Sequence, residues 1–407
     1  MANEFIKLGP SKSSQKWLYV ILGILIMLCL GTVYAWSVFR LPVENTFGVG
    51  STQSGLPYMV SLAVFALTMI FTGKYLDCYH PRWVLMAGGF IAGMGWFLSG
   101  NARNITDLTL TYGVIVGAGV GIAYGVPIAV TAKWFAGKSG AVLGIVLIGF
   151  GISPLLTSPL ARSLIESQGI FNTFRILGLA FGTAIPILSL PFRYPTATLQ
   201  TLEAQGKPKD EILLEADTQT MVRSINFKGL YISFLIGTTI GLMLIGISNH
   251  VGVDLIQLPA KQAAWLISLF AVFNGIGRPT FGWLTDKISI RRTMLISYVL
   301  IGTAAVMMLF AEAGNTMLFA LAFSIFWFNL GGWLAIAPTA TRILFGSSHY
   351  SQNYGVVYSA YGIGAIIGVL ASGILNDWSQ GYTAIFILVL GLCLMGMATS
   401  QKWIQTT

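Results

Sequence analysis

The segment Gly73-Lys-Tyr-Leu-Asp77-Cys-Tyr-His-Pro-Arg82 has a counterpart 209 residues later, Gly282-Trp-Leu-Thr-Asp286-Lys-Ile-Ser-Ile-Arg291. Glycine and aspartate recur at the same offset, and each segment directly follows a long apolar run. Pro127 and Pro338 recur late in two other apolar runs, at an offset of 211 residues. This repetition predicts two similar halves, and parallel repeats of this kind build transporters whose binding site lies between the halves near the bilayer midplane.

The composition places the chain in a membrane. Of its 407 residues, 55% are hydrophobic and only 9% are charged, whereas soluble domains carry about 25% charged residues. This balance excludes disorder, a coiled coil and an ordinary soluble enzyme. The few cysteines indicate no disulfide scaffold. Three histidines without helical pairing, and the lack of a credible nucleophile motif, indicate no metal, no cofactor and no enzyme.

Apolar runs of about 20 residues each predict an all-α membrane protein with twelve transmembrane helices. The runs are 17–39, 53–73, 83–100, 105–127, 139–163, 172–192, 228–250, 262–285, 293–311, 315–338, 353–375 and 382–402. The only long polar interruption is 193–227, which we interpret as a cytoplasmic linker. The predicted domains are therefore two pseudo-symmetric six-helix bundles, 1–192 and 228–407, joined by this linker.

The positive charges predict the orientation. With both termini in the cytoplasm, 17 of the 23 lysines and arginines fall on the inner side and five on the outer side. One remains, Arg278, inside a span. This excess follows the positive-inside rule, so the net charge of +9 needs no nucleic-acid partner.

Arg278 is the one charged residue deep inside a predicted span. A cation near the bilayer centre costs at least about 2.5–3.5 kcal/mol, and no predicted span offers a carboxylate to pair with it. Arginine binds a carboxylate through two parallel hydrogen bonds, so we expect a small anionic ligand here. Asn274, four residues earlier, shares the helix face. The alternative is that Arg278 snorkels to the cytoplasmic interface.

Tyrosines deep in the spans extend the candidate site. Tyr358 and Tyr361 lie on one stripe of their span with Tyr354, and buried tyrosines need hydrogen-bond partners. Tyr34 and Tyr124 are placed similarly in spans 17–39 and 105–127. We expect Tyr350 to lie in the aromatic belt at the membrane surface. For Tyr354, both the belt and a buried position remain open.

Several of these stretches resemble a known family. The two Gly-x-x-x-Asp segments look like the signature loop of the major facilitator superfamily. Tyr34-Ala-Trp-Ser-Val-Phe, Asn274-Gly-Ile-Gly-Arg278-Pro and Asn353-Tyr-Gly resemble its oxalate–formate antiporter and monocarboxylate transporter branch. The resemblance covers essentially the whole chain. It implies the major facilitator fold, a carboxylate anchored by Arg278, and a location in a bacterial inner (plasma) membrane.

The resemblance also implies that the two signature loops act as a conformational latch. A glycine allows close helix approach, and an aspartate caps a neighbouring helix or pairs with a cation. The latch residues would be Gly73, Asp77, Arg82, Gly282, Asp286 and Arg291. Solvated loop charges without this role are the alternative.

Two departures from the family pattern bear on the substrate. The resembled oxalate exchanger has a lysine where this chain has Tyr361, and one cation suits a monocarboxylate such as lactate or pyruvate. Animal monocarboxylate transporters carry an aspartate where this chain has Asn274, so an Asp–Arg proton switch is unavailable. His250 and Asp254 are the remaining proton-coupling candidates, although an interfacial histidine beside a loop aspartate explains them better. The other route is that the proton travels on the carboxylic acid itself, while Arg278 binds the anion.

The sequence therefore predicts a monomeric secondary transporter in the lipid bilayer, moving a small monocarboxylate with a proton by alternating access. An oxalate:formate type of anion exchanger is the first alternative. An anion-binding membrane receptor or channel is the alternative from another class.

Overall fold

The structure, a computed structural model, describes residues 10–76, 79–135, 139–195, 215–346, 348–379 and 381–405. The first group of helices comprises α1 (Pro10–Leu30), η1 (Gly31–Ala35), α2 (Trp36–Phe47), α3 (Ser51–Leu76), α4 (Pro81–Ser99), α5 (Ile105–Leu108), η2 (Thr109–Val116), α6 (Gly117–Trp134) and α7 (Ser139–Ser189). The second group comprises α9 (Thr218–Arg223), α10 (Ile225–His250), η3 (Val251–Leu255), α11 (Ala260–Lys287), α12 (Ile290–Leu309), α13 (Thr316–Phe345), α14 (Tyr350–Ser379) and α15 (Thr383–Trp403).

The described residues form helices and no strands, as the apolar runs predict, because helices satisfy their own backbone in lipid. Nine helices among them are long and apolar enough to cross a membrane. One of these, within α7, is 50 residues long, and its helical geometry breaks at Gly169 with φ 75° and ψ 165°. A positive φ suits glycine and ends a helix. The twelve-span count and its domain boundaries stay predictions.

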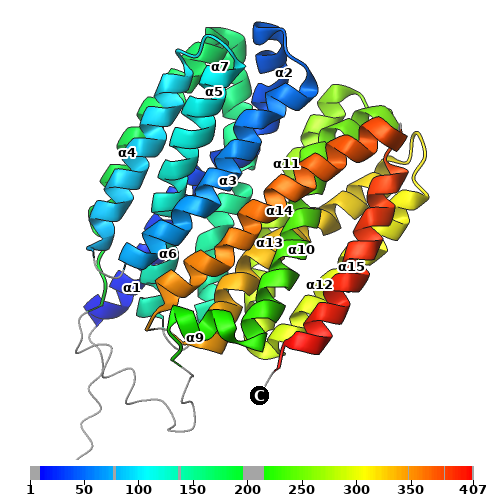
Figure 1. The fold of residues 1–407 in the computed structure, drawn as a ribbon. Coiled ribbons are helices and arrows are strands. Elements are labelled where there is room, and N and C mark those ends of the chain that lie inside the picture. Colours follow the sequence, from blue (N-terminus) through cyan, green and yellow to red (C-terminus); the bar gives the residue numbers. More distant parts are fainter. Residues whose placement is uncertain are drawn as a thin grey trace, which may run out of the picture.

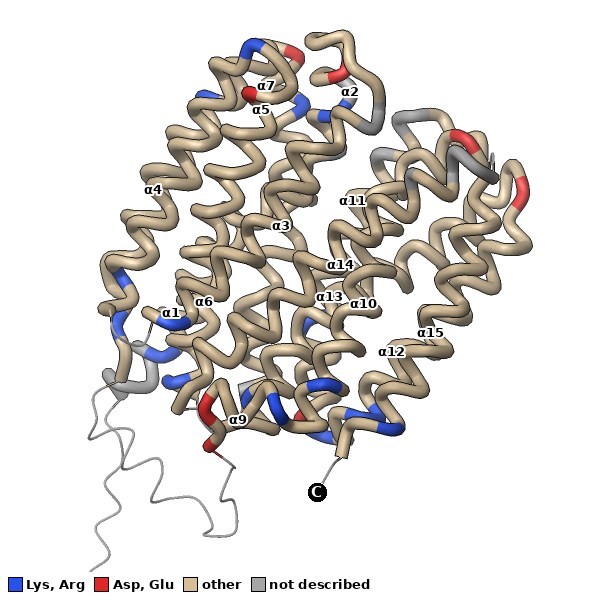
Figure 2. Tube along the Cα trace, viewed as in Figure 1, with Lys and Arg blue, Asp and Glu red and all other residues tan. Residues whose placement is uncertain are grey.

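The two groups of helices lie side by side (Figure 1), with α1–α7 on one side and α10–α15 on the other. The chain ends near α9, and we call this end of the molecule the α9 end. Lysines and arginines gather at the α9 end together with a few acidic residues, whereas the two signs are more evenly mixed at the opposite end (Figure 2). The charge distribution therefore differs between the two ends, as it does in the predicted topology.

Near the α9 end the two groups touch through glycines. A Cβ on Gly144 of α7 would lie 2.5 Å from the Pro279 Cα of α11. A Cβ on Gly355 of α14 would lie 2.7 Å from the carbonyl oxygen of Met69 in α3. Such contacts need small residues, because any side chain would push the helix backbones apart.

The opposite end is hollow. A cavity of about 550 Å³ opens there between α2, α7, α10 and α11. Its wall includes Arg162 and Glu166 of α7, Asn249 of α10, and Trp265 of α11. In the described part of the chain, the two groups are therefore in contact near the α9 end, which we call closed, and separated by the cavity at the opposite end, which we call open.

Candidate functional site

Arg278 is completely buried in α11, with 0% of its surface exposed. Its Nη2 donates a hydrogen bond to Asn274 Oδ1 at 3.2 Å. Its guanidinium carbon lies 5.5 Å from the centroid of the Phe150 ring. Within the described residues, Nε and Nη1 have no hydrogen-bond partner and no carboxylate pairs with the charge. The arginine therefore does not snorkel to the surface, and it presents two donor atoms without partners.

Close packing of α11 places this side chain. Asn274 Nδ2 donates to the carbonyl oxygen of Trp327 in α13 at 3.0 Å, which fixes the amide. On the other side, a Cβ on Gly151 of α7 would lie 2.9 Å from Arg278 Nε. The glycine thus leaves room for the guanidinium between α7 and α13.

Aromatic rings from several helices form a cluster around Phe150, the ring beside the guanidinium. Phe150 of α7 lies 5.0 Å from Tyr34 and 5.1 Å from Tyr124, measured between ring centroids. Phe65 of α3 lies 5.0 Å from Tyr124 and 5.2 Å from Tyr358. A ring face next to a cation is attractive, but rings alone do not neutralise a buried charge.

Hydroxyl groups of this cluster point to a polar ligand. The Tyr34 and Tyr361 hydroxyls share a hydrogen bond of 2.6 Å, joining η1 to α14. The hydroxyls of Tyr124 and Tyr358 have no hydrogen-bond partner in the described part of the chain. The charge of Arg278 acts on the hydroxyls of Tyr34 and Tyr124. The cation and these hydroxyls therefore lie in one buried cluster, a set of groups suited to an anion with two or more oxygens.

The structure brings the six predicted substrate-binding residues together and adds two that the sequence did not predict. Tyr34, Tyr124, Asn274, Arg278, Tyr358 and Tyr361 are all buried at one place. Phe65 and Phe150 also belong there, because their rings contact the tyrosines. A signal existed for Phe65, which lies 209 residues before Asn274 at the repeat offset; Phe150 had none.

The expected belt position of Tyr350 is wrong. Tyr350 is only 3% exposed and Tyr354 only 2%. Their rings stack with centroids 5.8 Å apart on the face of α14 that meets the first group of helices. They are buried because α14 crosses the molecule between the two groups rather than along its lipid surface.

His250 and Asp254 lie away from the arginine, at the open end. His250 ends α10, and Asp254 lies in the π-helical turn η3 that continues it. The Tyr382 hydroxyl donates to Asp254 Oδ2 at 2.8 Å. The charges of Arg40, Glu44 and Asp254 act on His250. The pair is therefore remote from Arg278, beside Asn249 in the cavity wall.

The predicted latch residues take different positions. Gly73 lies against the Ser351 carbonyl oxygen and Gly282 against that of Gly140, so each glycine sits at a contact between the two groups. Arg82 stacks on its neighbour Trp83, with 4.9 Å between the guanidinium and the ring centroid. Asp77 lies outside the described residues.

Asp286 contacts the start of α7 instead of Arg291. The backbone N–H groups of Gly140 and Ala141 interact with its carboxylate, and Arg342 Nη2 of α13 lies 4.0 Å from Oδ1. Arg291 is exposed at the start of α12. Burial raises the pKa of Asp286, whereas Arg342 and the two N–H groups oppose the shift. The carboxylate of α11 thus caps a helix of the other group.

Comparisons with known proteins identify the family. The sequence matches the Major Facilitator Superfamily over residues 19–259 and 227–405. The "Oxalate:formate antiporter" of Oxalobacter formigenes is 29% identical over 360 residues, which cover 87% of this chain and 83% of the relative. "Monocarboxylate transporter 12" of Homo sapiens is 24% identical over 445 residues, covering 98% of this chain and 83% of the relative.

A solved structure has the same fold. The Major Facilitator Superfamily transporter FucP, in its outward conformation, superposes with a TM-score of 0.68 at 13% identity. The match covers 95% of this chain and 100% of that chain. With sequence and fold in agreement, the chain belongs to the Major Facilitator Superfamily and is a membrane transporter, not an enzyme, related to the oxalate:formate antiporter and the monocarboxylate transporters.

Proposed function

We propose that this transporter carries a small monocarboxylate of the lactate or pyruvate type, with the carboxylate bound by Arg278. The observation that carries the proposal is the fully buried guanidinium whose Nε and Nη1 have no partner among the described residues. A carboxylate accepts two parallel hydrogen bonds from such a group. The hydroxyls of Tyr124 and Tyr358, which belong to the same buried cluster, would donate to the same oxygens.

The substrate would neutralise the cation and so permit the conformational change. A buried cation without a counter-ion opposes closure of a dry site. Binding of an anion through the cavity at the open end removes this cost and allows both ends to close. The contacts of Gly73, Gly282 and Asp286 at the α9 end would then break as the other end closes, which is alternating access.

Proton coupling is part of the proposal. His250 and Asp254 are the candidate carriers, and they lie where a proton and an anion would enter together. Symport of one proton with one anion is electroneutral, which matches a site with a single cation. We further propose a monomer in a bacterial inner membrane with both termini in the cytoplasm. The lysines and arginines at the α9 end support this orientation.

The test is uptake of labelled lactate by proteoliposomes that contain the wild type, Arg278→Lys or Arg278→Ala. We expect both variants to lose uptake, because a lysine offers one point charge in place of the planar fork. Arg175→Ala is the matched control. That arginine is hydrogen-bonded to Asn101 and Asn172 at the surface of the open end, away from the site. Full uptake by Arg278→Ala would refute the proposal.

An anion exchanger of the oxalate:formate type is the second candidate, favoured by the 29% identity to the antiporter. Counterflow that needs no pH gradient would support it over proton symport. In the structure Tyr361 of α14 occupies the site, hydrogen-bonded to Tyr34, where a dicarboxylate would need a second cation. Tyr361→Lys should therefore shift preference toward dicarboxylates, and an unchanged preference would contradict this view of the substrate.

A further inference from the structure

A row of four tyrosines runs along one face of α14 from the candidate site toward the α9 end. Tyr361, Tyr358, Tyr354 and Tyr350 follow one another at helical spacing. Consecutive ring centroids lie 4.9, 5.6 and 5.8 Å apart. All four side chains are buried. The row therefore forms a continuous aromatic strip inside the protein.

The hydroxyls of this row lack partners. Within the described residues, the hydroxyls of Tyr350, Tyr354 and Tyr358, and that of Tyr124 on the facing helix α6, make no hydrogen bond of good geometry. The Tyr124 hydroxyl faces those of Tyr354 and Tyr358 closely enough to interact with them, whereas no such neighbour in the described part of the chain faces Tyr350. A buried hydroxyl without a partner destabilises the fold, and native proteins contain few. Phenylalanine would fill nearly the same space without that cost. A ligand that reaches them in another state of the molecule would supply the partner that these hydroxyls lack.

The surroundings of the row favour an anionic partner. The charge of Arg278 acts on Tyr354, and the charge of Arg342 acts on Tyr350. Arg342 is the arginine that lies 4.0 Å from Asp286 at the α9 end. Arg278 therefore lies within electrostatic reach of Tyr354, and Arg342 within reach of Tyr350 at the α9 end of the row. The hydroxyls of these two tyrosines can donate to an anion that passes between the two cations.

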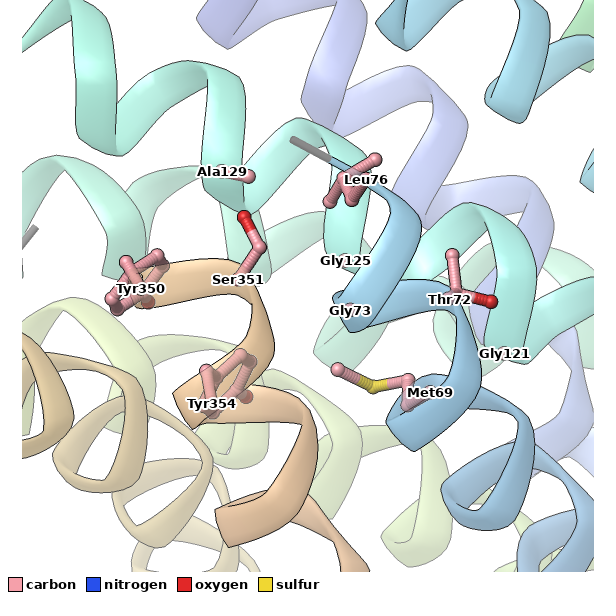
Figure 3. Close-up of a pocket in the computed structure, with 10 residues that line it drawn as sticks. All are labelled: Met69, Thr72, Gly73, Leu76, Gly121, Gly125, Ala129, Tyr350, Ser351 and Tyr354. Atoms are coloured by element: carbon pink, nitrogen blue, oxygen red, sulfur yellow. The ribbon is translucent and has the colours of Figure 1, made fainter. Parts of the chain in front are cut away.

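Small residues face the row across the interface between the two groups. A hollow of about 10 Å³, room for about one water molecule, lies beside Tyr350 and Tyr354 (Figure 3). Gly121 and Gly125 of α6 line its far wall. A Cβ on Gly125 would meet nothing closer than 3.8 Å. Separation of the groups at the α9 end would widen this hollow first, because it already holds space.

We propose that Tyr350 and Tyr354 form a second, transient carboxylate site on the release route from Arg278 to the α9 end. It rests on the proposed function, since it takes the same carboxylate. In the closed conformation the two hydroxyls are held without partners. When the α9 end opens, they donate to the carboxylate oxygens as these leave Arg278, and so lower the barrier to release.

Tyr350→Phe, Tyr354→Phe and the double variant test this proposal. The matched control is Tyr112→Phe in η2, which removes another fully buried hydroxyl without a described partner. Tyr112 packs on Trp36 and Trp96, on the open side of the first group. We expect every variant to keep or raise its melting temperature, because each loses a buried polar group that makes no hydrogen bond.

The tyrosine variants should change the rate of lactate release without changing lactate binding. Thermal shift induced by lactate should match the wild type in all variants, because Arg278 is intact. Release of labelled lactate from loaded proteoliposomes should slow roughly tenfold for each hydroxyl removed from the row, and not in Tyr112→Phe.

Three outcomes would overturn the inference. The first is wild-type release by the double variant, and the second is equal slowing in Tyr112→Phe. The third is loss of proton coupling with unchanged lactate exchange, which would assign the row to protons. In each of these the wild type still binds lactate, so the proposed function stands. A wild type without carboxylate binding would overturn both.

Discussion

Gly144→Ala should push the transporter out of the conformation described here. Gly144 lies on α7 where that helix crosses α11, beside the residues that carry the candidate site. The added Cβ would lie 2.5 Å from Pro279 Cα and 2.7 Å from the Arg278 carbonyl oxygen. Both are backbone atoms of a buried helix, so no side chain can rotate away to make room.

The magnitude follows from the distances. An ordinary contact begins at 3.4 Å, so a Cβ at 2.5 Å requires a separation of the two helices by about 0.9 Å. Overpacking of this kind costs about 1–3 kcal/mol. Because the cost applies only while α7 and α11 are in contact here, the population closed at the α9 end should fall about 5- to 150-fold relative to the open one.

Spin labels at Tyr75 and Ile288 would measure this shift by double electron–electron resonance in a cysteine-free background. Both positions are exposed, Tyr75 at the α9 end of α3 and Ile288 directly after α11. We expect the label distance to lengthen in Gly144→Ala and to stay unchanged in Gly246→Ala, where a Cβ on α10 meets nothing within 4 Å. An unchanged distance distribution in Gly144→Ala, with an unchanged melting temperature, would refute the reasoning.

Two further predictions concern charge. Asn274→Asp would place a carboxylate where Asn274 Oδ1 accepts a hydrogen bond from Arg278 at 3.2 Å. Because this carboxylate would pair with Arg278 in place of the substrate, the melting temperature should rise and lactate affinity at neutral pH should fall by about tenfold or more. Lactate affinity should return as the pH falls and the new carboxyl is protonated. Lactate-induced thermal shift measured at several pH values checks this, and an affinity that does not change with pH would contradict it. Burial raises the pKa of Asp286, so the closed α9 end binds its proton more tightly than an open one. Closure should therefore be favoured at acid pH and weaken as pH rises through the raised pKa. Asp286→Asn should remove this dependence in the same spin-label experiment, and an equal slope in that variant would argue against a role for Asp286.

The sequence alone determined the membrane class and identified Arg278 as the candidate ligand-binding residue. Length and apolarity identify helices that cross a bilayer, because lipid satisfies no backbone group. The recurrence of Gly73 and Gly282 at a fixed offset indicated a duplicated transporter. A charge as costly as that of Arg278 stands out in an apolar span without any knowledge of its neighbours.

Local spacing also predicted one contact of the site. Asn274 and Arg278 are four residues apart, so helix geometry brings them together wherever the helix lies. The tyrosines were identifiable by type and depth. Their hydrogen bonds were not, because Tyr34 and Tyr361 are separated by 327 residues and meet only when η1 and α14 pack together.

Contacts between the two groups of helices were decided by the tertiary structure. Phe65 and Phe150 are ordinary apolar residues in their own spans, and only the approach of α11 and α14 makes them walls of the site. Asp286 meets the start of α7 and Arg342 rather than the nearby Arg291, because its helix ends against the other group. Tyr350 is buried for the same reason. Which side chains face each other across an interface depends on the relative placement of whole helices, and periodicity within one helix carries no information about that placement.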